Sequence, residues 1–147
     1  MILNRDFKEF ISSLNASGVR YLVIGGYAVA FHGRPRYTKD LDVWIEVSED
    51  NAQRIMQALK AFGFGALDVT VQDFLKPGQI LQLGRPPHRI DLLSFADGVD
   101  FADCYATRVE ADVDGVQMCF IDLERLKQNK RASGRPQDLA DLDLLEE

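Results

Sequence analysis

Three aspartates and a pair of glycines are the residues of this chain whose types and spacing suggest chemistry. Asp40 and Asp42 stand two residues apart in the run DLDVWIEV, and alternate side chains of a β-strand point to the same face. Both carboxylates therefore project together. The apolar residues that alternate with them fill the opposite, buried face: Leu41, Val43, Ile45 and Val47. Two parallel carboxylates suit a hard divalent cation such as Mg²⁺, which takes oxygen ligands and shares them with substrate phosphates. The pair predicts metal-assisted phosphate chemistry.

A third aspartate, Asp91, lies in the middle of a second apolar run, HRIDLLSF. Burying an isolated carboxylate in such a run is costly unless the carboxylate is paired or binds a cation. If this run forms a strand beside the strand of Asp40 and Asp42, Asp91 completes a site of three carboxylates. Two cations held there would lower the pKa of an attacking hydroxyl and neutralise a leaving pyrophosphate. We expect Asp40 and Asp42 to bind metal, and Asp91 to bind metal or to act as the base.

Gly25 and Gly26 follow the apolar run YLVI and precede the apolar run YAVAFHG. Glycines let the backbone approach phosphates closely, and the N-terminus of a following helix would face their negative charge. The chain contains neither GxGxxG nor GxxxxGK[ST], which excludes those two glycine-rich nucleotide motifs. Trp44 falls on the face of the two strand aspartates. It either stacks on a base or packs as a buried aromatic residue beneath a helix.

The elements that must position these residues alternate between helix and strand in the first half of the chain. Predicted helices cover residues 4–17, 27–33, 48–63, 122–130 and 137–146. Predicted strands cover residues 21–24, 40–47, 67–71, 79–83 and 88–95, and residues 107–120 form a hairpin that turns at Asp114 and Gly115. Ser48 as N-cap and Gly63 as C-cap mark the ends of one helix. The alternation favours an α/β (α+β) fold with a mixed β-sheet flanked by helices, in one domain over residues 1–147. A β-meander with helices at its edges is the topological alternative.

The composition is that of a globular protein without a membrane span. Of the 147 residues, 46% are hydrophobic and 27% are charged, and no run reaches the roughly 18 consecutive apolar residues of a transmembrane helix. The N-terminal run MILNRDFKEF lacks the apolar stretch of a secretory signal. Cys104 and Cys119 form no CxxC pair and suit small core positions better than a disulfide or a zinc site. We expect a reduced, cytoplasmic compartment.

The net charge of −6 excludes a sequence-independent DNA coat, which needs a broad basic surface. The positive charges nevertheless gather in three short segments, at residues 34–39, 85–89 and 127–135. Such clusters can accommodate a triphosphate without making the whole protein basic.

Together these residues resemble the nucleotidyltransferase superfamily, whose fold is shared with DNA polymerase beta. The shared pattern is an apolar strand, Gly-Gly, thirteen residues, Asp-Leu-Asp-Val, and a later Asp on an apolar strand. The segment from Gly33 to Lys39, ahead of the aspartates, is similar to the Arg-x-Thr lead-in of small bacterial members. The ending LKQNKRASGRPQDLADLDLLE resembles the closing helices of abortive-infection-type nucleotidyltransferases of toxin–antitoxin systems. The likeness covers about residues 18–95 for the catalytic core and 121–146 for the tail.

The resemblance implies an enzyme that uses Mg²⁺ or Mn²⁺ to move a nucleoside monophosphate from an NTP such as ATP to a hydroxyl group. It implies that the nucleotide is bound by Gly25, Gly26, Arg36, Thr38, Lys127 and Lys130. The implied acceptor is a tRNA or a protein, in a toxin–antitoxin or phage-defence system with a cognate toxin or antitoxin as partner. Two alternatives are an antibiotic nucleotidyltransferase for aminoglycosides or lincosamides, and a non-catalytic, antitoxin-like module that binds a nucleotide or a partner. The apolar strands late in the chain also favour a homodimer.

Overall fold

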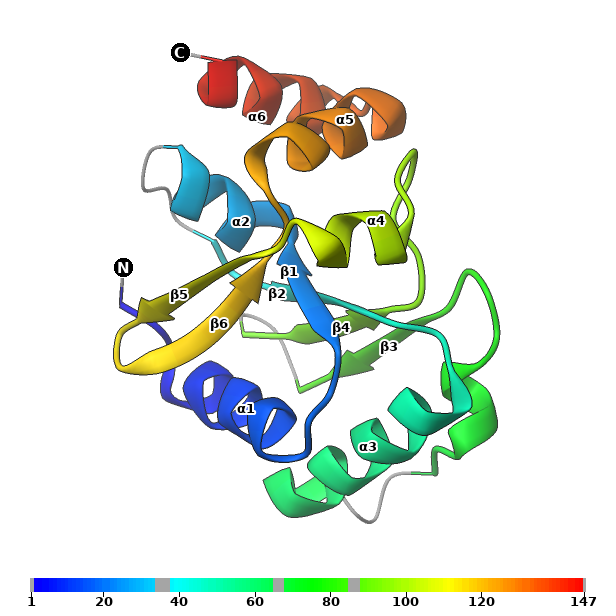
Figure 1. The fold of residues 1–147 in the computed structure, drawn as a ribbon. Helices are drawn as coiled ribbons and strands as arrows, with labels where there is room; N and C mark the ends of the chain where they lie inside the picture. Colours follow the sequence, from blue (N-terminus) through cyan, green and yellow to red (C-terminus); the bar gives the residue numbers. More distant parts are fainter. Residues whose placement is uncertain (1, 34–37, 65–67, 85–87, 147) are drawn as a thin grey trace.

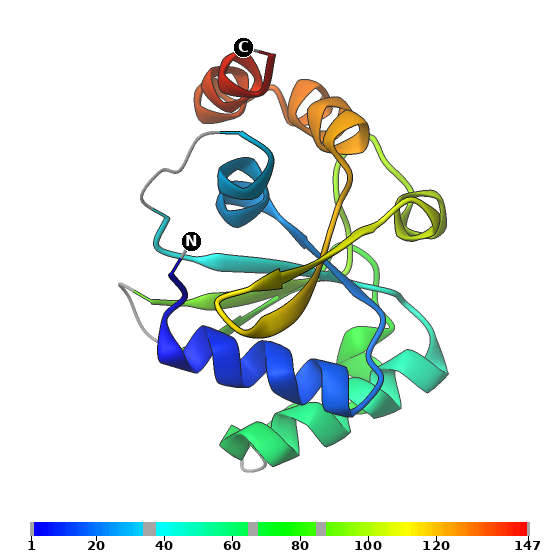
Figure 2. The same ribbon diagram turned by 60° about the vertical axis from the view of Figure 1, so that its left-hand side comes forward.

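A mixed β-sheet between two layers of helices is the framework of the protein (Figures 1 and 2). The computed structural model describes residues 2–33, 38–64, 68–84 and 88–146. Its strands are β1 (Tyr21–Ile24), β2 (Leu41–Ile45), β3 (Ile80–Leu83), β4 (Ile90–Leu93), β5 (Val109–Val113) and β6 (Val116–Phe120). Its α-helices are α1 (Arg5–Ala16), α2 (Gly25–His32), α3 (Glu49–Leu59), α4 (Phe101–Ala106), α5 (Leu123–Ser133) and α6 (Pro136–Glu146).

The six strands follow the order β3-β4-β2-β1-β6-β5 in the sheet. The neighbours β2 and β4 are parallel, as are β1 and β6, while the remaining pairs are antiparallel. Parallel neighbours need long crossover connections, which a meander lacks. The mixed, helix-flanked sheet is therefore confirmed.

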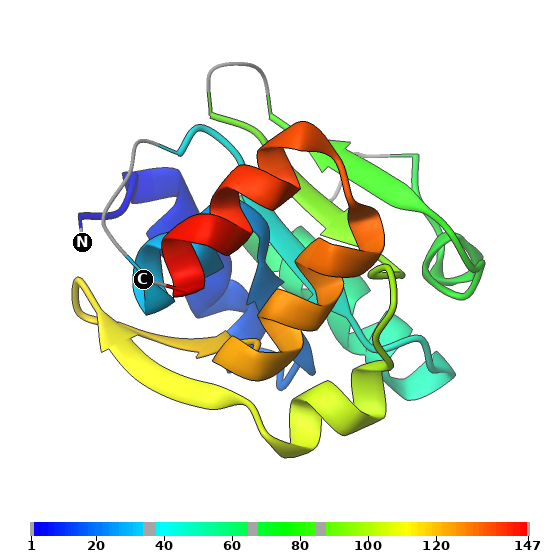
Figure 3. The ribbon, with the colours of Figure 1, turned by 90° about the horizontal axis from the view of Figure 1, so that it is seen from above.

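The helices divide between the two faces of the sheet. Helices α1 and α3 cover one face, and α2, α4, α5 and α6 lie on the other (Figure 2). Viewed from above, α5 and α6 form a hairpin that crosses over α2 (Figure 3). The predicted apolar face of α1 is buried as a block: Phe7, Phe10, Ile11 and Leu14. Strand β1 is buried along its whole length, as expected for a strand at the centre of a three-layer structure.

Several predicted elements have other boundaries or another form. The strand predicted for residues 67–71 is wrong over its described residues, because Val71–Phe74 is a 3₁₀ turn. Its start is held by a capping box in which the Asp73 carboxylate accepts a hydrogen bond from the Thr70 backbone N–H at 2.7 Å. Strand β2 ends at Ile45, which leaves Val47 42% exposed instead of buried.

The sequence prediction also missed α4 and misplaced one helix end. Asp100 caps α4 by accepting from the Asp103 backbone N–H. Ser48 is the N-cap of α3 as predicted, but the α-helix stops at Leu59 and continues as a π turn over Lys60–Phe64 that includes Gly63. The hairpin of β5 and β6 turns at Asp114 and Gly115, both with positive φ, as predicted.

Candidate active site

The three aspartates predicted to form the site lie on, or directly next to, two neighbouring strands. Strands β2 and β4 are parallel, and Asp42 is the register partner of Asp91. Partners in register on adjacent strands point to the same face of the sheet, so these two carboxylates are side by side. Asp40 directly precedes β2. The condition set for Asp91 by the sequence, a strand beside that of Asp40 and Asp42, is met.

The junction of β1 and α2 closes the site next to Asp42. Strand β1 pairs with β2 on the side away from β4, and α2 begins at Gly25, immediately after β1. Gly25 has φ +68°, and a Cβ atom built on it would lie 2.1 Å from Oδ2 of Asp42. A side chain at this position would force the Asp42 side chain to move. Gly25 is therefore needed both for its backbone conformation and because the Asp42 carboxylate packs against the start of α2.

Burial and like charge act together on Asp42. Burial raises the pKa of the Asp42 carboxyl to about 7, and the neighbouring carboxylates of Asp91 and Asp40 add to the rise. The positive charges of Lys130 and Arg89 oppose it only in part. The Asp42 carboxyl therefore holds its proton to a higher pH than an exposed aspartate does.

Arg89 is a site residue for which the sequence analysis predicted no individual role. Its Nε donates to Asp91 Oδ1 at 2.8 Å, and its Nη2 donates to Asp91 Oδ2 at 3.1 Å and to Asp40 Oδ2 at 3.2 Å. One guanidinium therefore joins two of the three carboxylates. The signal in the sequence was the i, i+2 spacing of Arg89 and Asp91 in an apolar strand, which places both on one face.

The C-terminal hairpin brings a buried lysine towards the site. Lys130 of α5 lies between two carboxylates of α6, with its Nζ 3.3 Å from Asp138 Oδ1 and 3.1 Å from Asp141 Oδ2. All three residues are buried. Gly134, in the left-handed conformation, ends α5 and allows α6 to fold back, and Arg135 adds an ion pair of 2.8 Å to Asp138. The Arg-x-x-Asp-x-x-Asp segment of the tail is thus an ionic cluster around Lys130.

Comparisons with known proteins were made at the level of sequence and of structure. No protein-family sequence model matches the chain, and no curated protein matches it significantly. Solved structures do match. A Thermotoga maritima protein assigned as a nucleotidyltransferase is 16% identical, with a TM-score of 0.60 over 95% of this chain and 89% of that one. An antigenic nucleotidyltransferase-like protein of Paracoccidioides brasiliensis is 18% identical, with a TM-score of 0.57 over 95% of this chain and 72% of that one. The lincosamide antibiotic adenylyltransferase LnuA, in a lincomycin-bound structure, is 14% identical, with a TM-score of 0.56 over 99% of this chain and 97% of that one.

This chain has the nucleotidyltransferase fold. The fold recognised from the sequence motifs is confirmed, since three structures described as nucleotidyltransferases or nucleotidyltransferase-like share it over nearly the whole chain. At these identities the likeness establishes the fold and leaves the chemistry to the residues of the site.

The fit of a divalent cation to this nucleotidyltransferase fold can be judged from the donor set. Within the described residues, no group of three Asp, Glu, His or Cys side chains is arranged so that it could hold a metal ion. The guanidinium of Arg89 instead stands in as the cation of Asp40 and Asp91. Carboxylate oxygens alone are the donor type that Mg²⁺ and Mn²⁺ favour over softer metals. The residues therefore fit a hard divalent cation by charge and by donor chemistry.

The remaining predicted nucleotide-binding residues differ in where the nucleotidyltransferase fold places them. Gly26 is buried in the first turn of α2, and the Thr38 carbonyl accepts from the Tyr27 hydroxyl at 3.3 Å. Lys127 pairs with Glu124 within α5 at 3.8 Å. Arg36 lies outside the described residues.

Trp44 follows Asp42 along the same face of β2 but does not line an open base site. The residue is 3% exposed, and its ring meets that of Phe101 of α4 edge to face, with centroids 5.2 Å apart. Of the two hypotheses, the buried aromatic residue beneath a helix is confirmed.

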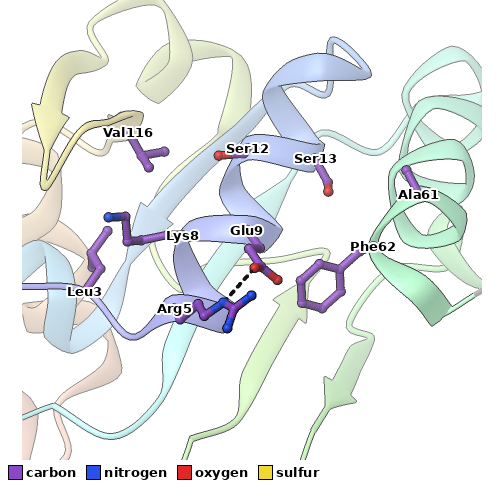
Figure 4. Close-up of a pocket in the computed structure, with 9 residues that line it drawn as sticks. All are labelled: Leu3, Arg5, Lys8, Glu9, Ser12, Ser13, Ala61, Phe62 and Val116. Carbon is purple, nitrogen blue, oxygen red and sulfur yellow. Dashed lines mark hydrogen bonds and ion pairs between the residues drawn. The ribbon is translucent and has the colours of Figure 1, made fainter.

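A separate hollow of about 670 Å³ lies on the outer side of α1, between the turn after α3 and strand β6 (Figure 4). Its lining includes the Arg5–Glu9 ion pair of 3.0 Å, together with Phe62 and Val116. None of the residues predicted to bind metal or nucleotide lines it.

In the described part of the chain, no helix is both long and apolar enough to cross a membrane.

Proposed function

We propose that this protein is a metal-dependent nucleotidyltransferase that moves a nucleoside monophosphate from an NTP to a hydroxyl acceptor and releases pyrophosphate. The observation that carries the proposal is the placement of Asp42 and Asp91 in register on adjacent parallel strands, with Gly25 and the start of α2 against them. Carboxylates on a strand pair, facing a glycine turn that opens a helix, bring a cation and a triphosphate to one place.

The charge of the site supports the binding of a cation by Asp40, Asp42 and Asp91. Part of the rise in the pKa of Asp42 comes from the like charges of Asp91 and Asp40, and a divalent cation would relieve that repulsion on binding. When bound, Mg²⁺ or Mn²⁺ would neutralise the triphosphate and lower the pKa of the attacking hydroxyl. The α2 N-terminus offers backbone N–H groups to phosphate oxygens, and Lys130 lies close enough to lower the pKa of Asp42. Positioning and charge neutralisation are the main demands of this reaction.

The proposed acceptor is a hydroxyl of tRNA or of a protein, in a toxin–antitoxin or phage-defence setting, as the likeness of the tail suggests. A second candidate is a small antibiotic molecule. It is favoured by LnuA, described as a lincosamide adenylyltransferase, with which nearly all of this chain and of that one superpose. A chain of this size therefore has room for the whole of such a fold.

The decisive experiment incubates the protein with Mg²⁺ and α-³²P-labelled NTPs, in parallel with total tRNA, a protein extract, lincomycin and an aminoglycoside. We expect label to reach one acceptor class, to depend on Mg²⁺ and to disappear in Asp42→Asn. The matched control is Asp68→Asn, which removes an exposed carboxylate outside the helices and strands and should retain transfer. No transfer to any acceptor, together with no Mg²⁺-dependent nucleotide binding by calorimetry, would overturn the proposal in favour of a non-catalytic partner-binding module.

A further inference from the structure

All the observed side-chain hydrogen bonds of Arg89 are donated to carboxylates that the proposed function assigns to metal binding. Three bonds of 2.8, 3.1 and 3.2 Å run from its guanidinium to Asp91 and Asp40. The pairing with Asp91 is bidentate, which is the strongest geometry available to an arginine and a carboxylate. The Asp91 side chain is 11% exposed and that of Arg89 is 28% exposed, so solvent screens these bonds less than it screens surface pairs.

A divalent cation and the Arg89 guanidinium therefore compete for the same oxygens. A cation that coordinates Asp91 and Asp40 must replace hydrogen bonds that Arg89 makes to both. The displaced guanidinium would be left without a partner in a partly buried place, which is unfavourable unless another anion is present. The triphosphate of a nucleotide is such an anion, and a planar guanidinium binds phosphate as readily as carboxylate.

We propose that Arg89 is the internal counterion of the carboxylate site, and that it makes metal binding depend on nucleotide binding. Without nucleotide, Arg89 holds Asp40 and Asp91 and keeps free metal out. With a metal–nucleotide complex, the metal takes the carboxylates and Arg89 turns to a phosphate of the nucleotide. Arg89 is in this sense a positioning and selectivity residue. This inference rests on the proposed metal and nucleotide site.

The test measures binding of Mn²⁺ by electron paramagnetic resonance, with and without the non-reactive analogue α,β-methylene ATP. In Arg89→Gln the side chain still forms hydrogen bonds but has no charge, so free Mn²⁺ should bind about tenfold more tightly than in the wild type. The Mn²⁺–analogue complex should bind about tenfold more weakly, because the phosphate loses its arginine. The gain in Mn²⁺ affinity caused by nucleotide should therefore nearly vanish in the variant.

Arg108→Gln is the matched control. Arg108 also pairs with a carboxylate, at 3.0 Å from Glu110, and its side chain has a similar exposure of 33%. It flanks β5, which β2, β1 and β6 separate from β4 in the sheet. Its replacement should leave both Mn²⁺ affinities at wild-type values. Arg89→Lys, which keeps the charge but loses the bidentate geometry, should fall between wild type and Arg89→Gln.

The outcomes separate this inference from the proposed function. If Arg89→Gln binds free Mn²⁺ no more tightly than the wild type, while Asp42→Asn abolishes Mn²⁺ binding, the counterion role is overturned and the metal site stands. If the wild type binds no Mn²⁺ even with the analogue, both are overturned.

A measurement on the unaltered protein guards against a variant that does not fold. In ¹⁵N NMR spectra, the Arg89 Nε–H, which donates to Asp91, should shift with Mg²⁺ plus analogue and stay in place with Mg²⁺ alone. An equal shift with Mg²⁺ alone would contradict the proposal.

Discussion

Replacing Asp42 by Asn should stabilise the protein at neutral pH. The pKa of this carboxyl is raised from 3.8 to about 7 in the folded state, first by burial and then by the charges of Asp91 and Asp40. A raised carboxyl pKa means that the folded protein binds more protons than the unfolded chain between these two values. The contribution of Asp42 to the free energy of unfolding therefore falls as the pH rises from about 4 to about 7, and then levels off. Asn has nearly the shape of a protonated Asp and does not ionise.

The magnitude follows from the size of the rise. About three pH units, at about 1.36 kcal/mol each, give an upper limit of about 4 kcal/mol for the cost of ionising Asp42 at pH 8. Urea unfolding followed by circular dichroism at pH 4, 6 and 8, without divalent metal, measures it. The advantage of Asp42→Asn over the wild type should be near zero at pH 4 and largest at pH 8. Asp68→Asn, which removes an exposed carboxylate, serves as the control and should show no comparable growth.

A stability difference between wild type and Asp42→Asn that stays constant from pH 4 to pH 8 would refute this account of the electrostatics. A wild type that gains stability over Asp42→Asn as the pH rises would also refute it, because it would mean that the ionised carboxylate stabilises the fold. Saturating Mn²⁺ and nucleotide should reduce the advantage of the variant, since only the wild type gains from the cation.

Three further substitutions test other parts of the structure by chemical denaturation. Gly25→Ala should lower the free energy of unfolding by at least about 2 kcal/mol, because it combines a positive φ with a clash against Asp42. Gly78 has the same φ of +68° but no atom within 4 Å of an added Cβ, so Gly78→Ala should cost only about 1 kcal/mol. Equal losses would mean that the carboxylate does not pack on the glycine. Lys130→Met should cost about 3–5 kcal/mol because it removes a buried cation from Asp141 and from Asp138, of which Asp138 keeps its ion pair with Arg135. Trp44→Ala should cost about 3–5 kcal/mol as a core truncation, and an unchanged nucleotide affinity of the folded variant would distinguish packing from base stacking.

The parts of the structure that depend on local patterns were predicted well from the sequence. The faces of α1 and β2, the cap at Ser48 and the turn at Asp114 are set by residues within a few positions of each other. The failures have equally local causes. The strand predicted for residues 67–71 shows the alternation of a strand, but the side chain of Asp73 bonds the Thr70 backbone and closes a turn instead. Helix α4 is too short to show a clear helical period.

The candidate site shows where sequence reasoning stops. Asp91 could be placed on a strand, but its register with Asp42 depends on how β4 pairs, which the sequence does not determine. The role of Arg89 depends on the same pairing, since only the assembled sheet brings it to Asp40. The surroundings of Lys130 depend on α6 folding back at Gly134, which joins residues that the sequence keeps apart.

Because Gly25 packs against Asp42, the residues that evolution can accept at these two positions depend on each other. While an aspartate stands at 42, any side chain at 25 collides with it, so selection on the carboxylate also preserves the glycine. Once a descendant loses the carboxylate, only the backbone conformation still favours glycine, and the asparagine or aspartate that tolerate such a conformation become acceptable there. Among relatives of this protein, a non-glycine residue at 25 should therefore accompany a change at 42. Such a pair of changes would mark lineages that keep the fold but have lost the chemistry of the carboxylate site.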